Sequence, residues 1–405
     1  MKKFLTVLAV MTALFSAGLF AEKTPYSSAD KATQKLLKKT NKLIQKEQYE
    51  SAFASLSEIE NEYTIAKSIE ICTNYFAVSM MHTMFGFKNL EKGETLLDVR
   101  RGDGTYNYTV YNPAEVVKAY VEEHGEKPIL DYALGLYYDD VLARYSGNWI
   151  MSDEEIAAKS LEHLSKAYDQ KCYDGYSLSV LGLIYCTRNE YEKADSVYAR
   201  KDDEGFDFTA DDYYNYAIIL TNLDQLEKAL KYAEKSIKGY SDNPEYQIES
   251  YTLSADIALY LNDFKKAKSL IKKCQDKYPE HYRPLFSWIK YYVYQNDVEN
   301  VLKKTAELYA IEPENPKLLQ SILGQFFDLG TPNYLTPFFE NALNEYKDNL
   351  SAKQNLLIHY AYLLKVLGNK EAAKEKVELA REELKKDDSL SPGIEEFLNS
   401  IITEE

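Results

Sequence analysis

The chain is poor in the residues that most often carry chemistry. Among 405 residues there are 4 cysteines and 5 histidines, with no CxxC and no Cys/His cluster. The sequence also lacks an HExxH motif, a G-x-S-x-G elbow and a Walker-type phosphate loop. These absences predict no metal, no cofactor and no catalytic residue, so we expect a protein that is not an enzyme.

The few cysteines are widely spaced, which excludes the dense disulfide framework of a small secreted domain. Cys172 and Cys186 form the one plausible pair, and the alternative is that both are free. Cys274 falls on the packing face of a predicted helix, where a thiol serves as a small hydrophobic side chain.

Positive charge is scarce relative to negative charge. The chain has 48 lysines and arginines against 64 acidic residues, for a net charge of −16. Without a basic patch, contacts to a phosphate backbone have no electrostatic source, so nucleic acid is excluded as a partner. The acidic stretch from Asp202 to Asp212 is either a calcium site or a solvated linker. It lacks the residue order of an EF-hand loop, which favours the linker.

Only one long hydrophobic run is present, at the N-terminus. Lys2 and Lys3 precede an apolar stretch from Phe4 to Phe20, and Ala21 stands at a possible cleavage position. This pattern predicts a signal peptide over residues 1–21 and export to the periplasm or beyond. The alternative is an uncleaved membrane anchor, because the run is near the lower length limit for a span. No later run is long enough, so no membrane insertion is expected after cleavage.

A pattern of two short helices recurs along the chain. In Leu178–Tyr198, Gly182 on the first helix and Ala194 on the second are small where two helices would cross closely. The same crossing position returns at intervals of 34 to 38 residues, and another apolar or small residue follows twelve positions later each time. The crossing positions are Gly182, Ala217, Ala255, Ile289, Gly324 and Ala361. Between the two helices stand residues that tolerate a left-handed backbone. They are Asn189, Asp224, Asn262, Asn296 and Gly368.

This recurring unit resembles the tetratricopeptide repeat (TPR), a helix-turn-helix unit of about 34 residues. The resemblance implies an all-α solenoid, in which helix pairs stack into a right-handed superhelix. It is strongest over residues 174–383, which are predicted to form a regular array. Residues 22–173 are predicted to be divergent helical repeats, and residues 384–405 a C-terminal capping helix.

Residues 96–111 interrupt the helical periodicity. Apolar and polar residues alternate on both sides of Arg101-Gly102-Asp103-Gly104, which predicts one small β-hairpin inserted into the helical array. The tripeptide Arg101-Gly102-Asp103 matches an integrin-adhesion motif, but a turn explains these residues equally well. Residues Ala66 to Phe87, ahead of this segment, are predicted to form one helix.

The TPR resemblance implies that partners bind on the concave surface formed by the first helices. Counting from each crossing residue, the groove-facing positions lie six and three before it and one, four and five after it. The groove predicted in this way is rich in tyrosine, acidic in its first half and basic near Arg283 and Lys290. Its residues are Tyr132, Asp139, Asp140, Tyr176, Asp211, Tyr214, Asn222, Tyr260, Arg283, Phe286, Lys290 and Tyr294.

The resemblance implies a non-catalytic scaffold in the cell envelope that binds another protein or an extended peptide. The clamp for terminal carboxylates known in some TPR proteins is not expected, because Tyr, Asp and Ser occupy its Lys and Arg positions. The alternative is a periplasmic TPR protein that binds a small ligand or assists a transporter. A cell-wall enzyme would need a separate catalytic domain, and no stretch remains to form one.

Overall fold

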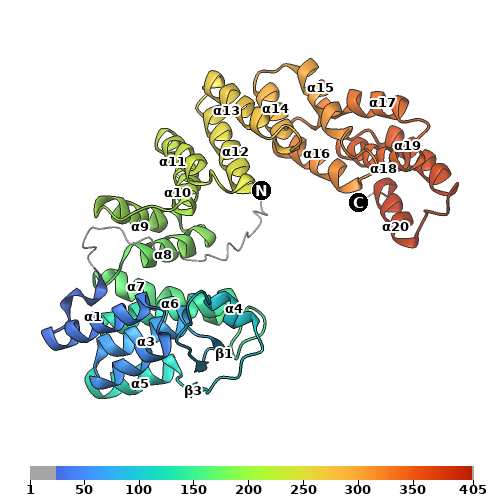
Figure 1. The fold of residues 1–405 in the computed structure, drawn as a ribbon. Helices are drawn as coiled ribbons and strands as arrows, with labels where there is room; N and C mark the ends of the chain where they lie inside the picture. The colour runs from blue at the N-terminus through green and yellow to red at the C-terminus, as the bar shows by residue number, and fades with distance from the viewer. Residues whose placement is uncertain (1–23, 404–405) are drawn as a thin grey trace. The chain divides into compact units, whose positions relative to one another are not determined.

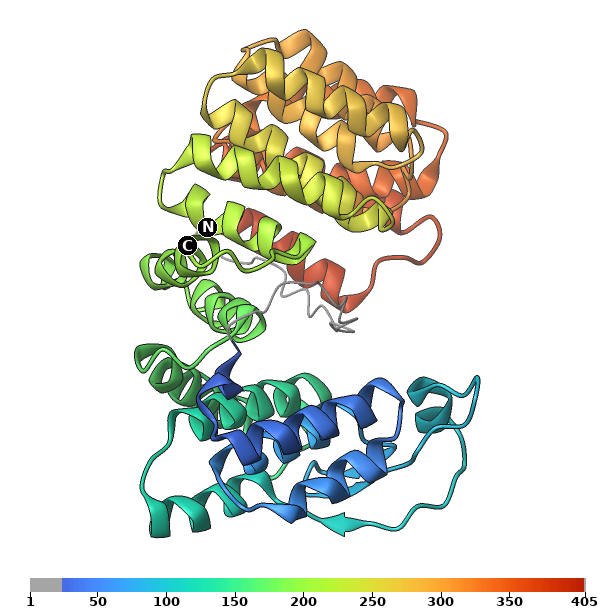
Figure 2. The same cartoon turned by 60° about the vertical axis from the view of Figure 1, so that its left-hand side comes forward.

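The computed structural model describes residues 24–403, so the predicted signal peptide lies outside the described residues. The chain divides into two compact units, which we call the N-terminal unit (24–223) and the C-terminal unit (224–403). Each is built mostly from α-helices that pack as consecutive pairs (Figures 1 and 2). The prediction of an all-α fold of stacked helix pairs with a small β element is confirmed. No described helix combines the length and the apolar character needed to cross a bilayer.

In the N-terminal unit, a long central helix, α6, packs against α3 on one side and α7 on the other. The helical elements of this unit are η1 (Pro25–Ser28), α1 (Lys31–Gln45), α2 (Tyr49–Ser55), η2 (Leu56–Glu58), α3 (Glu62–Asn74), α4 (Leu96–Arg101), α5 (Pro113–His124), α6 (Pro128–Tyr145), α7 (Asp153–Asp169), α8 (Gly175–Thr187), α9 (Tyr191–Asp203) and α10 (Ala210–Asn222).

In the C-terminal unit, α12 pairs with α13, α14 with α15, and α18 with α19, while the shorter α17 packs against α18. The helical elements of this unit are α11 (Leu226–Gly239), α12 (Pro244–Tyr260), α13 (Phe264–Lys277), α14 (Arg283–Tyr294), α15 (Val298–Tyr309), α16 (Pro316–Asp328), η3 (Pro332–Tyr334), α17 (Leu335–Glu345), α18 (Leu350–Val366), α19 (Lys370–Leu384) and α20 (Pro392–Ile402).

The helix starts follow local signals in the sequence. The Ser152 hydroxyl accepts from the Glu155 N–H, and the Glu155 carboxylate accepts from the Ser152 N–H, which forms the capping box that opens α7. Asn243 caps α12, whose first residue is Pro244. Proline suits that position because its missing N–H would have no intrahelical partner there.

The turns inside the helix pairs have the predicted left-handed residues. Asn189, Asp224, Asn262 and Asn296 have φ between 54° and 59°, and Gly368 has φ 78°. Each of the five predictions of a left-handed residue is therefore confirmed. These residues end the first helix of a pair because a left-handed backbone breaks its hydrogen-bond ladder and lets the chain reverse.

The predicted close crossing is present at Gly182, where a Cβ atom would lie 2.5 Å from the ring of Tyr198. Ala194 on the second helix is completely buried in the same pair. Gly324 differs, because a Cβ atom there would meet nothing within 4 Å. Small size is therefore required at Gly182 and is not required at Gly324.

A three-stranded antiparallel sheet follows α3, and its position corrects two predictions. Strand β1 (Val78–Met80) pairs with β2 (Met84–Gly86), which also pairs with β3 (Thr109–Val110). The helix predicted from Ala66 to Phe87 is wrong beyond Asn74, where α3 ends. The hairpin predicted over 96–111 is also wrong, because that stretch begins with helix α4 and only its last two residues before Tyr111 are strand.

The physical reason for both errors lies in tertiary contacts. The β1–β2 turn places Met81 and His82 at φ 49° and 51°, a conformation that hairpins usually assign to Gly, Asn or Asp. The indole of Trp149 donates to the Met81 carbonyl at 2.7 Å and holds this turn from a distant part of the chain. In α4, Val99 is buried and Arg100 donates from Nε to the Phe76 carbonyl at 3.0 Å, which favours a helix over the apparent strand alternation.

The C-terminal end of the chain packs back on the last helix pair. Leu398 and Ile401 of α20 are buried, and α20 contacts both α18 and α19. Arg381 of α19 forms an ion pair with Glu395 at 2.8 Å.

All four cysteines are free, so Cys172 and Cys186 do not form a disulfide.

Candidate functional site

Three of the predicted groove residues lie together where α6 approaches its C-terminal end and α8 begins. Asp139 and Asp140 of α6 are half-buried, and Tyr176 in the first turn of α8 is 40% exposed. Burial, followed by the negative charges of Asp139 and Asp140, raises the pKa of the Tyr176 hydroxyl. The three side chains therefore share one electrostatic environment, and we call them the Asp139–Tyr176 surface.

Asp139 has no hydrogen bond or ion pair with any described residue. Burial and the neighbouring charge of Asp140 raise its pKa to about 7. A carboxyl with this pKa is partly protonated near neutral pH, so it is able either to donate or to accept a hydrogen bond. Asp139 is thus the polar group of this surface that remains available to a ligand.

Asp140 is fully engaged by neighbouring side chains. Its Oδ2 atom lies 2.6 Å from His82 Nε2, and the Nε of Arg144 donates to its two oxygens at 2.8 and 3.0 Å. Burial alone would raise the pKa of Asp140, but its hydrogen bond with His82 and the charge and hydrogen bonds of Arg144 lower it overall. Asp140 is therefore ionised and fixed in position, in contrast to Asp139.

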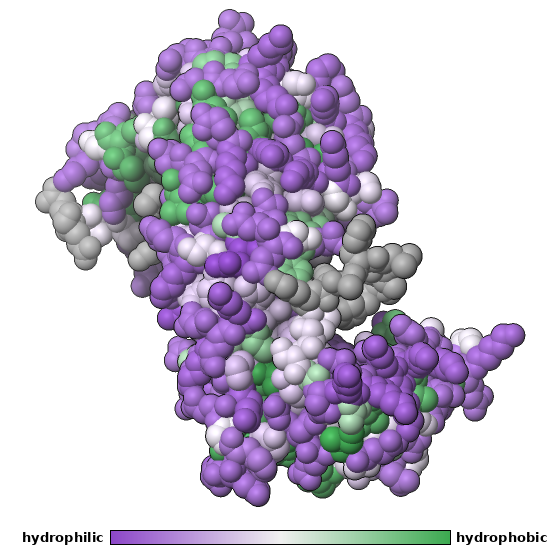
Figure 3. All heavy atoms as spheres, turned by 90° about the vertical axis from the view of Figure 1, so that its left-hand side faces the viewer, coloured by the Kyte–Doolittle hydropathy of each residue, from purple (hydrophilic) through white to green (hydrophobic). Residues whose placement is uncertain are grey.

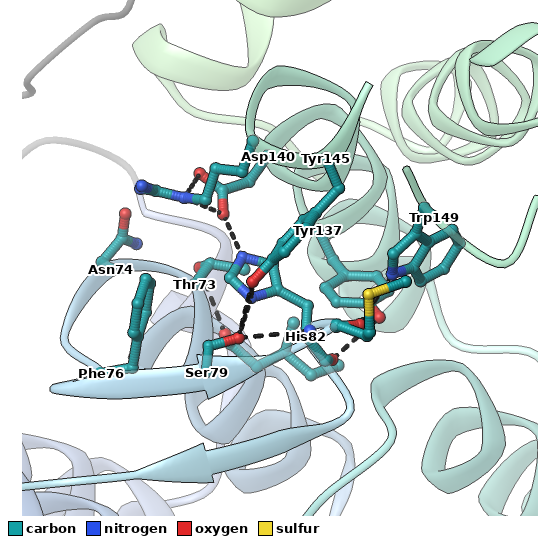
Figure 4. Close-up of polar contacts among 12 residues, drawn as sticks. Thr73, Asn74, Phe76, Ser79, His82, Tyr137, Asp140, Tyr145 and Trp149 are labelled. Carbon is teal, nitrogen blue, oxygen red and sulfur yellow. Dashed lines mark hydrogen bonds and ion pairs between the residues drawn. The ribbon is translucent and has the colours of Figure 1, made fainter. Parts of the chain in front are cut away.

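A chain of hydrogen bonds extends from Asp140 to the β1–β2 turn (Figure 4). The Ser79 hydroxyl lies 2.7 Å from His82 Nδ1 and 2.9 Å from the Tyr145 hydroxyl. Because ionised Asp140 only accepts hydrogen bonds, His82 carries its proton on Nε2, and Nδ1 accepts from Ser79. Ser79 in turn accepts from Tyr145, so each polar group has a partner.

The Ser79–His82–Asp140 contacts have the order of a nucleophile, a base and an orienting carboxylate. The His82 side chain is completely buried, however, and the Ser79 oxygen also accepts from the His82 N–H at 3.2 Å. No edge of the imidazole is left open to a substrate. The network instead holds the left-handed turn, where the Tyr137 hydroxyl donates to the His82 carbonyl at 3.0 Å, and it fixes the orientation of Asp140.

Two arginines give this region a cationic side. The guanidinium carbons of Arg100 and Arg144 lie 4.0 and 5.3 Å from the centre of the Phe76 ring. Burial, with the nearby charge of Arg144, lowers the pKa of Arg100 to about 10. The predicted acidic character of the first half of the groove is therefore balanced by arginines that are absent from the predicted set.

The structure corrects the placement of Tyr132. Its side chain is 6% exposed, and its hydroxyl donates to Asp174 Oδ2 at 2.8 Å, which ties α6 to the N-terminal cap of α8. The other predicted residues of this unit lie on α10. Asp211 and Tyr214 are half-buried, and Asn222 is exposed, with its amide donating to the Ile218 carbonyl at 2.9 Å.

A buried ion pair joins α9 to α10 across the acidic stretch. Lys201 Nζ lies 2.7 Å from Asp212 Oδ2 and 2.6 Å from the Ser179 hydroxyl, and both charged residues are almost completely buried. Asp212 also belongs to the capping box of α10 with Thr209. Across residues 24–403, no group of three or more His, Cys, Asp or Glu side chains is arranged to hold a metal ion.

In the C-terminal unit, the predicted cations of the groove are already paired. Lys290 of α14 lies 2.8 Å from Asp256 Oδ2 and donates to the Tyr260 hydroxyl at 3.2 Å, while Arg283 pairs with Glu249 at 2.5 Å. Burial opposes the charge on Lys290, but Asp256 and Tyr260 raise its pKa overall. The positive charge predicted near Arg283 and Lys290 is therefore balanced, because carboxylates of α12 pair with both cations.

Aromatic side chains accompany these ion pairs on α12 and α14. Tyr260 is 42% exposed, and its ring centre lies 6.4 Å from that of Tyr294. Phe286 is half-buried beside the exposed Tyr282, at 6.0 Å between ring centres. Figure 3 shows a face of the molecule where hydrophilic residues prevail and hydrophobic residues form small patches. A partner of these helices would thus meet tyrosine and paired charges.

No family model matches the sequence, and no curated protein matches it. Among solved structures, the chain is similar to a tetratricopeptide repeat protein from Parabacteroides merdae, with 16% identity, 67% of this chain and 99% of that one covered, and a TM-score of 0.41. It is also similar to YrrB, a TPR protein with an unusual peptide-binding site (17% identity, 51% and 96% covered, TM-score 0.39). A further similar structure is PilW, a type IV pilus biogenesis factor (14% identity, 52% and 89% covered, TM-score 0.37).

The helix pairs are TPR-like. Their repeating length, left-handed turns and buried small residues establish this within the chain itself, and similarities as low as these add no argument about function.

The TPR offsets found Asp139, Asp140 and Tyr176, but they missed His82, Arg144 and the other partners of Asp140. Arg144 was detectable, since it stands four residues after Asp140 on one helix face. Nothing in the local sequence indicated that His82 would lie next to Asp140.

Proposed function

We propose that the protein is a non-catalytic scaffold that binds another protein or an extended peptide on the first helices of its TPR-like pairs. The observation that carries the proposal is the Asp139–Tyr176 surface. It joins a large exposed aromatic side chain to a half-buried carboxyl that has no protein partner, on a support fixed by the His82 network. Tyrosine suits recognition because it combines a large contact area with a hydrogen-bonding tip.

The C-terminal unit supports the same proposal independently. Tyr260 is 42% exposed, and the ammonium of Lys290, which pairs with Asp256, lies 4.9 Å from the centre of its ring. A partner backbone would therefore find both aromatic surface and polar groups. Because the charges are mutually paired, binding here should depend on shape and hydrogen bonds more than on net charge. We expect only a weak dependence on salt concentration at this part of the surface.

The proposal includes export to the cell envelope. Its support is the sequence of residues 1–21, in which two lysines precede an apolar run with alanine at the possible cleavage position. Cell fractionation with an antibody against the full chain tests this point. Recovery of the mature, shortened chain in the envelope fraction is expected, and full-length chain in the cytoplasm would contradict it.

The binding surface is tested by affinity capture from native envelope extracts. The full chain is compared with a Tyr176→Ala/Asp139→Asn variant, a Tyr260→Ala variant and a Tyr108→Ala control. Tyr108 is similarly exposed but lies in the loop before β3, outside the first helices. We expect the first two variants to lose a partner that the control retains, with unchanged far-UV circular dichroism. Equal capture by all four proteins would reject the surface.

A further inference from the structure

A cleft in the N-terminal unit lies between α5, α6 and α7 and is lined by none of the predicted groove residues. Its volume is about 340 Å³, within the range of small-molecule sites. The floor is apolar: Val117, Leu130 and Leu134 are buried there, and Val121 and Met151 are half-buried. A ligand that fills this space would bury hydrocarbon or aromatic surface against the floor.

One tyrosine that lines the cleft has a hydroxyl without a protein partner. Tyr138 is 3% exposed and lines the cleft, and no described residue makes a hydrogen bond with its hydroxyl. Tyr132, Tyr137 and Tyr145 on the same helix all have hydrogen-bond partners. The Tyr138 hydroxyl oxygen is not sealed from solvent, so it is free to donate a hydrogen bond to an acceptor atom of a ligand that enters the cleft.

The rim of the cleft carries lysines that are not committed to ion pairs. Lys118, Lys127 and Lys159 form no ion pair with a described residue, and Lys159 Nζ lies 5.6 Å from the centre of the Tyr138 ring. The remaining cationic groups are engaged, since His163 contacts Asp131 at 2.7 Å and Lys166 pairs with Glu162 at 2.7 Å.

Three carboxylates also line the cleft, Glu115, Glu126 and the Asp131 that contacts His163, so the lysines leave at most a small excess of positive charge. This balance favours a ligand with a single negative charge over a polyanion. We propose that the cleft binds a small amphiphilic carboxylate, with its apolar body on the floor and its carboxylate accepting from the Tyr138 hydroxyl and the lysine rim. This site goes beyond the proposed scaffold function. Its ligand is a small molecule, because the volume of the cleft is too small to hold a helix of a partner protein.

Sodium decanoate is the probe, titrated into the full chain below its critical micelle concentration. The chain contains two tryptophans, and the ring of Trp149 lies 6.4 Å from that of Tyr138. In a Trp288→Phe background, Trp149 alone emits and therefore reports binding at the cleft. We expect saturable binding by calorimetry at one site, with a matching change in Trp149 emission. Absence of saturable binding up to the micelle concentration would overturn the proposal.

Two variants test the two halves of the site. Tyr138→Phe removes only the hydroxyl and should weaken decanoate binding roughly tenfold, as expected for a hydrogen bond to a charged group. Val117→Trp fills the floor and should abolish binding. The matched control Tyr334→Phe makes the same chemical change in η3, outside the cleft and outside the predicted groove, and should leave affinity unchanged. Unchanged affinity in both cleft variants would overturn the proposal.

The charge preference is tested with decyltrimethylammonium, which has a chain of the same length and the opposite charge. It should bind at least about tenfold more weakly than decanoate, since it offers no acceptor to Tyr138 and meets the lysine rim. Equal binding of the two probes would show that the cleft selects only for hydrocarbon, which contradicts the proposed carboxylate recognition.

Discussion

At the scale of single residues, neighbouring carboxylates on one helix have opposite properties. Asp140 is held ionised by His82 and Arg144, whereas Asp139 lies half-buried without a partner and has a pKa raised to about 7. The difference arises from the direction in which each side chain leaves α6. The Asp140 side chain contacts the β1–β2 turn. Asp139 lies beside Tyr176, where no hydrogen-bond donor or cation offsets the effect of burial on its pKa.

The raised pKa of Asp139 predicts a specific pH dependence of stability. The folded state holds this proton more tightly than the unfolded chain, whose Asp has the ordinary pKa of 3.8. The stability contributed by protonated Asp139 is therefore complete below about pH 4 and is lost as pH rises towards and through 7. Asp139→Asn removes this loss, so at pH 8 the variant should be more stable than the wild type by about 1–3 kcal/mol.

Urea unfolding at pH 5 and pH 8 provides the measurement. The advantage of Asp139→Asn over the wild type should be larger at pH 8 than at pH 5. The control Asp242→Asn changes an exposed carboxylate, and its effect should be small at both pH values. If Asp139→Asn had the same effect at both pH values, the assignment of a raised pKa would be wrong.

At the scale of elements, the regular helix pairs were predictable and the sheet was not. From Gly175 onward, crossing residues, turn residues and caps recur at matching offsets, so independent signals agree on each helix. The sheet depends instead on Met81 and His82, which adopt left-handed φ without being Gly, Asn or Asp. Their conformation is supported by Trp149 and Tyr137, more than fifty residues away in sequence, and local reasoning has no access to such contacts.

The β1–β2 turn offers a test at the level of this element. Met81 has φ 49°, which costs a residue with a Cβ atom roughly 1–2 kcal/mol, whereas the added chain entropy of glycine costs about 0.5–1 kcal/mol. We therefore expect Met81→Gly to raise the free energy of unfolding by about 0.5–1 kcal/mol, measured by urea denaturation. Thr83→Gly, two residues later at a position without positive φ, should lower it by a similar amount through chain entropy. Loss of stability in both variants would refute the strain argument.

The predicted site had a similar mixture of outcomes. The TPR offsets predicted groove positions for Tyr176 and Tyr260, whose repeats have the regular spacing. Both side chains are exposed, and their part in binding stays a prediction. The offsets failed at Tyr132, since Tyr26 and Glu70 from the preceding divergent segment contribute to its environment and the ring is buried. The pairing of Lys290 with Asp256 was also not predictable, because it depends on the register between two helices thirty-four residues apart.

At the scale of the whole molecule, the stability of the chain comes from a series of local hydrophobic cores. Each helix pair packs mainly on the pairs next to it in sequence, and the chain divides into two compact units at Leu223. In such an array, stability is approximately a sum of the stabilities of the pairs and of their nearest-neighbour interfaces. A defect in one core should therefore remain local.

Phe339 of α17 gives this expectation a direct test. Its ring is completely buried and stacks on Tyr360 of α18 with 5.1 Å between ring centres. Phe339→Ala should cost about 3–5 kcal/mol through lost burial and a residual cavity. Hydrogen–deuterium exchange followed by mass spectrometry should show faster exchange in α16 to α19 and unchanged protection in α6 and α7.

Phe397→Ala is the matched control, because that ring is 43% exposed on α20 and its removal should leave exchange almost unchanged. A uniform rise in exchange across α6, α7 and the C-terminal helices would mean that the units unfold together, against the local model. If the rise is confined as expected, a partner that orders the Asp139–Tyr176 surface would stabilise the N-terminal unit without tightening the C-terminal one. Each part of the TPR-like chain would then bind its ligand independently of the other.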